Sequence, residues 1–432
     1  MFTTDRNEEI TSSTIAYFIE KHRQLRPKYI EDKNFYEGNH DILHRAPRDA
    51  YKPDNRLIVN LAKYIVDTFN GFFIGVPVKQ SHKSEIVEES ISDFRRRSNV
   101  DNNEAELAKI SSIYGHAYEY LYQDENSLTR SIYTTPLDTF VVYDDTIEHK
   151  PYFAIRYYYD DNFKLVGELI TENYKAPISG GYGSDVKIGD PEIHYYGSVP
   201  VIEYLENDER QSIFENVKSL INALNNAISA KADDVDYFAD AYLKIIGAEL
   251  DEATMTALRA NRTINLAGDG SNDVTIEFLT KPNADDTQEN LITRLLDLIY
   301  QISMVANIND DSFGNASGVS LEFKLQPMRN LAIMKERKFK TAMQNRYKMI
   351  FNLPTNVPAS MKDEWMNIRY QFTRNLPRNI IEEADTATKL EGVISKETQL
   401  GLLSFVENPK EEMTRIADET PQATGFDFEK SE

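Results

Sequence analysis

Two long helical segments bracket a small module in the second half of the chain, and this arrangement limits the folds open to it. From residue 212 onward, apolar side chains recur every three or four residues over roughly 30 positions, which predicts a helix about 45 Å long. Ser212 and Glu215 have the spacing of a capping box at its start. A second amphipathic helix is predicted over 286–305. Residues 242–285 lie between the two helices and are expected to contain two strands within 264–278.

The first half of the chain predicts an α+β arrangement. Helical periodicity covers 12–35, 56–73, 84–97 and 103–114. From about 117 to 205 the pattern changes to Tyr-, Val- and Ile-rich strands separated by Asp, Asn, Gly and Pro. Further helices are predicted over 321–350 and in a C-terminal region with cap signals at Asn379, Ser395 and Asn408. The predicted fold class is therefore α+β and mainly helical.

Charge and composition exclude several classes of protein. The 432 residues carry a net charge of −22, whereas a conventional DNA-binding protein shows a basic footprint. There is no Cys, which excludes disulfides, thiolate zinc sites and Cys nucleophiles. We expect no signal peptide and no membrane span, because no apolar run is long enough.

A polar loop at 307–320, NINDDSFGNASGVS, joins the helix at 286–305 to the helix at 321–350. Connections between helices are usually only a few residues long, and longer ordered loops are more often functional. Asp310 and Asp311 are adjacent carboxylates in it, but no further acid or His stands at the spacing of a metal site. A solvated loop is the more economical interpretation of these two residues.

Other candidate motifs have a plain structural interpretation beside a functional one. The glycines of 179–185 are typical of a hairpin tip and lack the Lys-Ser/Thr of a phosphate loop. His40 and His44 are four residues apart, without a zincin pattern, so a loop or surface role is expected. The basic run 95–97 fits a solvated helix face or a partner contact. The predicted 212–241 helix carries an acidic stripe that either faces water or lines a channel: Asp233, Asp236 and Asp240.

The order of these segments and their local sequences resemble those of the portal proteins of tailed bacteriophages, in particular the siphophage family typical of Gram-positive hosts. The stretches that carry the resemblance are KPDNRLIVNLAKYIVDTFNGFFIGVPV (52–78), SSIYGHAYEYLYQDE (111–125), HYYGSVPVIEYLENDERQSIFENVKSLINALN (194–225), DDSFGNASGVSLEFKL (310–325) and EGVISKETQLGLLSFVENPKEEMTRI (391–416). Together they span nearly the whole chain.

The resemblance implies a ring with a central channel, commonly of twelve subunits, and a division of each subunit into wing, stem, clip and crown. The corresponding segments here are the wing at 1–211 and 321–379, stem helices at 212–241 and 286–306, the clip at 242–285, the tunnel loop at 307–320 and the crown at 380–432.

The resemblance also implies partners and a place in the virion. Double-stranded DNA would pass through the channel without sequence specificity, and the terminase large subunit, head-completion protein, major capsid protein and scaffolding protein would bind the ring. The expected location is the portal vertex of the capsid, after assembly in the host cytoplasm, with no membrane contact. Terminase would contact the clip, with Arg259 and Arg262 as candidates.

The tunnel-loop candidates for the DNA channel are Asn309, Asp310, Asp311, Ser312, Phe313 and Asn315. A portal needs no cofactor, metal or catalytic residue, so no enzymatic activity is expected. The alternatives are a phage nuclease or accessory ATPase, which needs clustered acids or a P-loop, and an acidic assembly adaptor.

Overall fold

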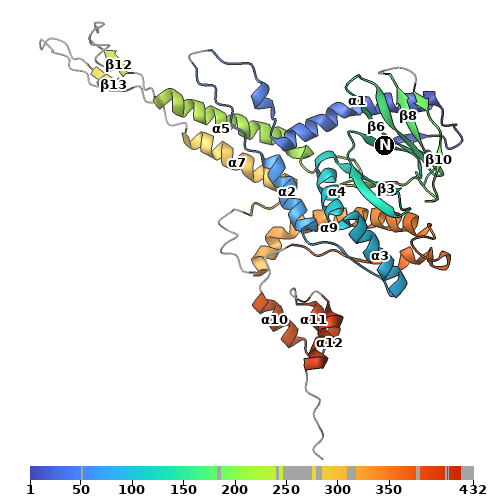
Figure 1. Cartoon of the computed structure of the whole chain (residues 1–432). Coiled ribbons are helices and arrows are strands. Elements are labelled where there is room, and N and C mark those ends of the chain that lie inside the picture. Colours follow the sequence, from blue (N-terminus) through green and yellow to red (C-terminus); the bar gives the residue numbers. More distant parts are fainter. Residues whose placement is uncertain are drawn as a thin grey trace, which may run out of the picture. The chain divides into compact units, whose positions relative to one another are not determined.

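The computed structural model describes residues 1–49, 52–181, 186–239, 243–246, 275–278, 285–308, 318–375, 380–403, 406 and 408–419. These residues form two compact units, Met1–Arg374 and Asn375–Glu432 (Figure 1). All six tunnel-loop candidates lie outside the described residues. The same is true of Asp240, Arg259 and Arg262.

A long N-terminal helix and a large sheet make up the first layer of the larger unit. Helix α1 (Ser12–Glu37) starts at Thr11, whose hydroxyl accepts a hydrogen bond from the Thr14 amide, and ends at Gly38 in the left-handed conformation. The sheet has the order β1-β5-β6-β7-β8-β10, with β9 paired to β8. Its strands are β1 (Phe2–Thr4), β5 (Thr139–Asp144), β6 (Pro151–Tyr159), β7 (Leu165–Thr171), β8 (Tyr174–Gly180), β9 (Lys187–Ile188) and β10 (Glu192–Ile193).

Successive side chains along each strand point to opposite faces of this sheet, and both faces are buried. On one face, Phe140, Phe153 and Leu169 pack with residues of α1 such as Ile15 and Phe18. The opposite face packs Val141, Ala154 and Ile170 against strand residues of a second sheet. All neighbouring strands are antiparallel except β1, which lies parallel to β5.

The second sheet, ordered β11-β3-β4, packs against α3, α4 and α9, and α2 packs in turn on α4 (Figure 1). Its strands are β3 (His116–Gln123), β4 (Thr129–Thr134) and β11 (Val201–Leu205), and the helices are α2 (Leu61–Ile74), α3 (Glu85–Ser98), α4 (Val100–Tyr114) and α9 (Gly318–Phe351). Gly115 joins α4 to β3 with φ +85°, and a Cβ there would lie 2.2 Å from the carbonyl carbon of Arg210. Only glycine fits both the conformation and the space.

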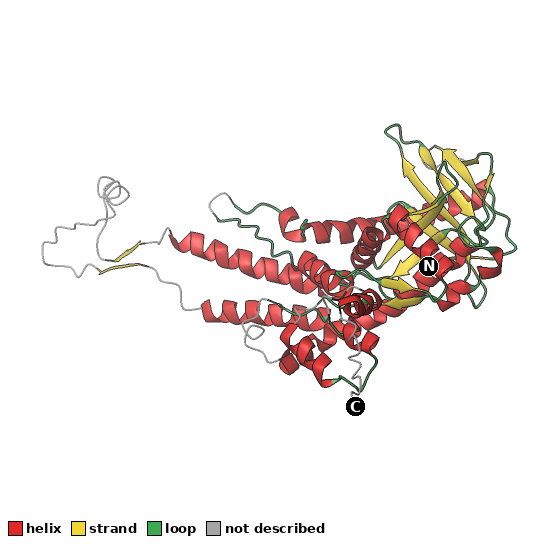
Figure 2. Cartoon of the chain, turned by 60° about the horizontal axis from the view of Figure 1, so that its bottom comes forward, coloured by secondary structure: helices red, strands yellow, loops and turns green. Residues whose placement is uncertain are grey.

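Two further helices, α5 (Lys218–Ala239) and α7 (Asp285–Ser303), run side by side in both views (Figures 1 and 2). Strands β12 (Leu243–Ile246) and β13 (Thr275–Phe278) pair antiparallel between them in sequence. The remaining elements of this unit are β2 (Lys79–Ser81), β14 (Arg369–Gln371), η1 (Asp41–His44), η2 (Glu215–Val217), η3 (Ala359–Met361) and η4 (Glu364–Asn367).

The C-terminal unit contains α10 (Ile380–Lys389), α11 (Lys396–Gly401) and α12 (Pro409–Glu419). Ser395 accepts from the Thr398 amide, and Asn408 accepts from the Lys410 amide, so both predicted caps are confirmed. Asn379, the third predicted cap residue, lies outside the described residues.

Several predicted boundaries were wrong. Helix α2 begins at Leu61 rather than at residue 56, because residues 53–60 are extended and Asn60 caps the helix. Ser212 and Glu215 do contact each other, but they form a turn and the short helix η2, and α5 begins only at Lys218. Of the two strands predicted within 264–278, the second is confirmed as β13, which pairs with β12, and the first lies outside the described residues.

Candidate functional site

The α5–α7 pair is held by polar contacts as well as by its apolar side. Lys231 forms an ion pair with Glu289, and Gln288 donates to Asp234 at 2.9 Å. Leu224, Leu295 and Ile299 are buried within the described part of the unit. Since the helices are antiparallel neighbours, Ala239 and Asp285 lie at the same end of the pair.

The extended segment 53–60, which we call the strap, lies along α5. Its amides at Val59, Leu57 and Asn55 donate to side chains spaced four residues apart on α5: Asn225 at 2.8 Å, Ser229 at 2.9 Å and Asp233 at 2.6 Å. Four helical residues rise about 6 Å, which nearly equals two extended residues, so the ladder stays in register. The strap thus joins α2 to the face of α5.

Asp233 was predicted to face water or to line a channel, and both interpretations are wrong for this residue. It is only 5% exposed, because it also accepts from Arg48 at 2.6 Å and lies 3.9 Å from Arg45. Asp236 is exposed and accepts from the Asn55 side chain at 2.6 Å. The stripe therefore serves at least in part to hold the strap.

The loop that follows α7 has a fixed starting point. The hydroxyl of Tyr64 on α2 accepts from the Ile308 amide at 3.0 Å and donates to the Ala306 carbonyl at 3.5 Å. The Tyr64 ring packs edge-on against Tyr300 of α7, with centroids 5.9 Å apart. Helix α2 therefore positions the first residues of the predicted tunnel loop.

Helix α9, which follows that loop, is anchored by two buried cations. Lys335 contacts Glu206 at 2.5 Å and donates to the Ser112 hydroxyl at 2.8 Å. Arg346 contacts Glu104 at 2.6 Å and Glu119 at 2.8 Å. Both cations occupy the inward positions of the helix, in one stripe with Phe339.

The two anchors differ in their electrostatics. Burial lowers the pKa of the Lys335 ammonium, although Glu206 opposes that shift. The Arg346 guanidinium also donates to the Tyr204 hydroxyl at 2.8 Å, and this tyrosine donates to Glu119. Burial raises the pKa of Glu104 despite the neighbouring arginine. The raised pKa favours the neutral form of Glu104, which offsets the imbalance of one Arg between two carboxyl groups.

The histidines do not form a metal site. His40 is buried rather than on the surface: it stacks on Phe35 and hydrogen-bonds Asn225 at 2.7 Å. His44 instead pairs with Asn39. In the part of the chain that is described, no group of three His, Asp or Glu side chains could hold a metal ion.

The remaining candidate motifs have local roles. Strands β8 and β9 pair across residues 181–186, as expected of a hairpin. In the basic run, Arg95 pairs with Asp101 and Arg96 pairs with Asp93. None of the described helices is long and apolar enough to cross a membrane.

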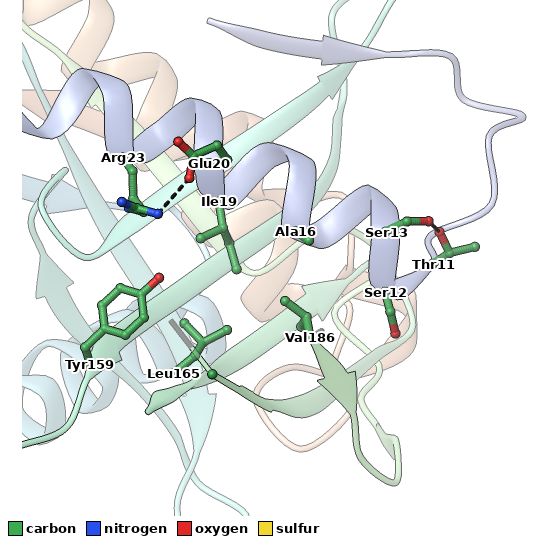
Figure 3. Close-up of a pocket in the computed structure, with 11 residues that line it drawn as sticks. Thr11, Ser12, Ser13, Ala16, Ile19, Glu20, Arg23, Tyr159, Leu165 and Val186 are labelled. Carbon is green, nitrogen blue, oxygen red and sulfur yellow. Dashed lines mark hydrogen bonds and ion pairs between the residues drawn. The ribbon is translucent and has the colours of Figure 1, made fainter. Parts of the chain in front are cut away.

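A cavity of about 1030 Å³ lies between the start of α1 and the strands β6 and β7 (Figure 3). Its polar residues contact one another: Arg23 donates to Glu20 at 2.7 Å, and the hydroxyls of Thr11 and Ser13 are 2.8 Å apart. The facing wall is apolar, with Leu165 and Val186. These residues do not form the nucleophile and base of an active site.

The family follows from comparison of the sequence. A model described as "Phage portal protein, SPP1 Gp6-like" matches residues 15–425. The chain belongs to this phage portal protein family. The portal protein described here is 25% identical over 399 residues to the portal protein of Bacillus phage SPP1, covering 87% of this chain and 78% of the relative. It is 23% identical over 407 residues to the portal protein of Clostridium phage phiCD119, covering 85% and 87%.

Both relatives come from phages of Gram-positive hosts, so the resemblance seen in the sequence is confirmed. Among solved structures, the neck of a native GTA particle computed with C12 symmetry covers 79% of this portal protein and 88% of its own matched chain. The TM-score is 0.41 and the identity 12%.

Sequence reasoning missed the strap and the two anchors of α9. A signal for the anchors was present, because Lys335 and Arg346 interrupt an otherwise apolar stripe at helical spacing. The strap gave no such signal. Its amides bind side chains on α5 about 170 residues away in sequence, and no local pattern encodes that.

Proposed function

We propose that this portal protein assembles into a closed ring, of twelve subunits, at one capsid vertex, and that double-stranded DNA is packaged and ejected through its channel. The observation that carries the proposal is the family match over residues 15–425. The antiparallel α5–α7 pair, followed by a loop with a fixed start, supports it because such helices suit a channel wall. A structural rather than an enzymatic role is what membership of this family implies.

In this proposal, residues 1–211 and 321–379 form the wing, 212–241 and 286–306 the stem, 242–285 the clip and 380–432 the crown. The loop 307–320 projects toward the DNA, with Asn309, Asp310, Asp311, Ser312, Phe313 and Asn315 as its contact candidates. Twelve copies at −22 each carry a formal −264. Such a ring forms few tight phosphate contacts, each of which would have to break as the DNA moves.

Deletion of residues 309–316 tests the role of the loop. We expect rings that still assemble but fill capsids with much less DNA, because the anchors of α7 and α9 lie outside the deleted segment. DNA protected in capsids from nuclease is the measurement. Wild-type filling by the deletion variant would contradict the proposed role.

The clip is proposed to bind the terminase large subunit through Arg259 and Arg262. The ring is also proposed to bind the head-completion protein, the major capsid protein and the scaffolding protein. We expect R259E/R262E to reduce stimulation of terminase ATPase by the ring, because both charges reverse. The same double change at the exposed Lys150 and Lys164 serves as a control. Full stimulation by R259E/R262E would exclude these two contacts.

A further inference from the structure

Helix α9 has a charge opposite to that of the chain as a whole. It contains eight Lys and Arg against two Glu, in a chain of net charge −22. Lys335 and Arg346 point inward and are neutralised by buried carboxylates. The other cations lie nearer the surface, so the accessible side of the helix is basic.

That side of α9 also carries large apolar residues. Phe323, which precedes Pro327 in the helix, is 76% exposed, and Met334, which follows it, is 50% exposed. Ile333, Arg337 and Lys340 are exposed on this side too. Among the described residues, neither Arg337 nor Lys340 has an ion-pair partner. We call these five residues the α9 face.

Helix α7 presents the complementary combination. Leu291 is 52% exposed and Ile302 is 45% exposed, again eleven residues apart. Asp286 and Asp297 are exposed farther round the helix, and the exposed Arg294 lies between them and the two apolar residues. The helix as a whole carries four acids and one Arg. We call Asp286, Leu291, Asp297 and Ile302 the α7 face.

We propose that the α9 face of one subunit docks against the α7 face of the next copy of this chain. This inference rests on the ring proposed above. A ring is closed by a heterologous contact between two different surfaces of the same chain, and each must complement the other. Here both faces are uncovered, both offer apolar side chains, and their charges are opposite, which sets partner and register.

The mixed character of the α9 face favours a protein partner over DNA. Phosphates are bound by cations and polar groups and gain nothing from an exposed Phe and Met beside them. Apolar residues at the centre with charges at the edge are typical of protein interfaces. The acidic, apolar α7 face would repel DNA.

A charge swap tests the pairing. The variant R337E/K340E makes the α9 face acidic, and D286K/D297K makes the α7 face basic. Each variant alone then opposes like charges at every contact, which we expect to reduce the ring fraction more than about tenfold. An equimolar mixture allows alternating subunits to meet with opposite charges at every contact, so even-numbered rings should reappear. Native mass spectrometry measures both the ring fraction and the alternation.

The outcomes separate the two proposals. K150E/K164E carries the same charge change as R337E/K340E, in the exposed turns before and after β6, and should form wild-type rings. If either swapped variant alone forms rings like the wild type, or if two folded variants, with unchanged circular dichroism, fail to form rings when mixed, the pairing of these faces is wrong while the ring itself stands. If the wild type stays monomeric, the ring proposal fails and this interface with it.

Discussion

Replacement of Arg346 by Met is expected to lower the free energy of unfolding by about 3–5 kcal/mol. The guanidinium is fully buried and is shared by Glu104, Glu119 and Tyr204. Without it, two buried carboxylates face each other with no cation, and the cost is that of unpaired charge rather than of a lost attraction. Methionine has a similar length, so a cavity contributes little.

Urea unfolding at pH 7 measures this change. Arg96→Met, at a mostly exposed arginine, is the matched control and should change the free energy of unfolding by less than about 1 kcal/mol. Adding Glu104→Gln and Glu119→Gln to Arg346→Met should recover part of the loss, because the uncompensated charges are then removed. A cost for Arg346→Met no larger than that of the control would show that α9 is not anchored through this network.

Wild-type protein should lose up to about 3 kcal/mol of stability through His22 alone as the pH falls from 7 to 4. Burial lowers the pKa of His22 to about 4. Its Nε2 donates to the Pro136 carbonyl at 2.7 Å and its Nδ1 accepts from the Tyr157 hydroxyl at 2.8 Å, so the neutral ring is fully used. Between about pH 6.5 and 4, His22 binds a proton in the unfolded chain but not in the folded chain. The free energy of unfolding therefore decreases as the pH falls through this window.

The measurement compares urea unfolding of the wild type and His22→Gln at several pH values between 7 and 4. The variant should start less stable but show a shallower loss with acid. His44→Gln, at an exposed histidine, is the matched control. Equal slopes for wild type and His22→Gln would contradict the assignment of this histidine as a neutral core residue.

Local signals in the sequence predicted much of the fold. Ser395 and Asn408 cap the helices that they were expected to cap, and the Tyr- and Val-rich segments form strands. The start of α2 was misplaced because the apolar residues Leu57 and Ile58 continue the helical pattern into the strap. There, tertiary hydrogen bonds to α5 outweigh local propensity.

Less of the candidate site than of the fold could be predicted from the sequence. Asp233 looks like any acid on an amphipathic helix, and only the position of Arg48 and the Asn55 amide reveals that it is buried. In the sequence, Tyr64 likewise looks like an ordinary position of α2. Only the structure shows that its hydroxyl accepts from the Ile308 amide. The strap and Tyr64 both connect the α2 region to the α5–α7 pair, so these contacts hold the long helices in place.

The central claim is that many copies of this chain close into a ring around a channel. Negative-stain imaging of the purified wild-type protein, with masses from native mass spectrometry of the same sample, tests it most directly. We expect ring-shaped particles with a central hole and masses that are whole multiples of one 49.7 kDa chain, with twelve as the main species. A sample that is monomeric, or that forms closed particles without a hole, would contradict it.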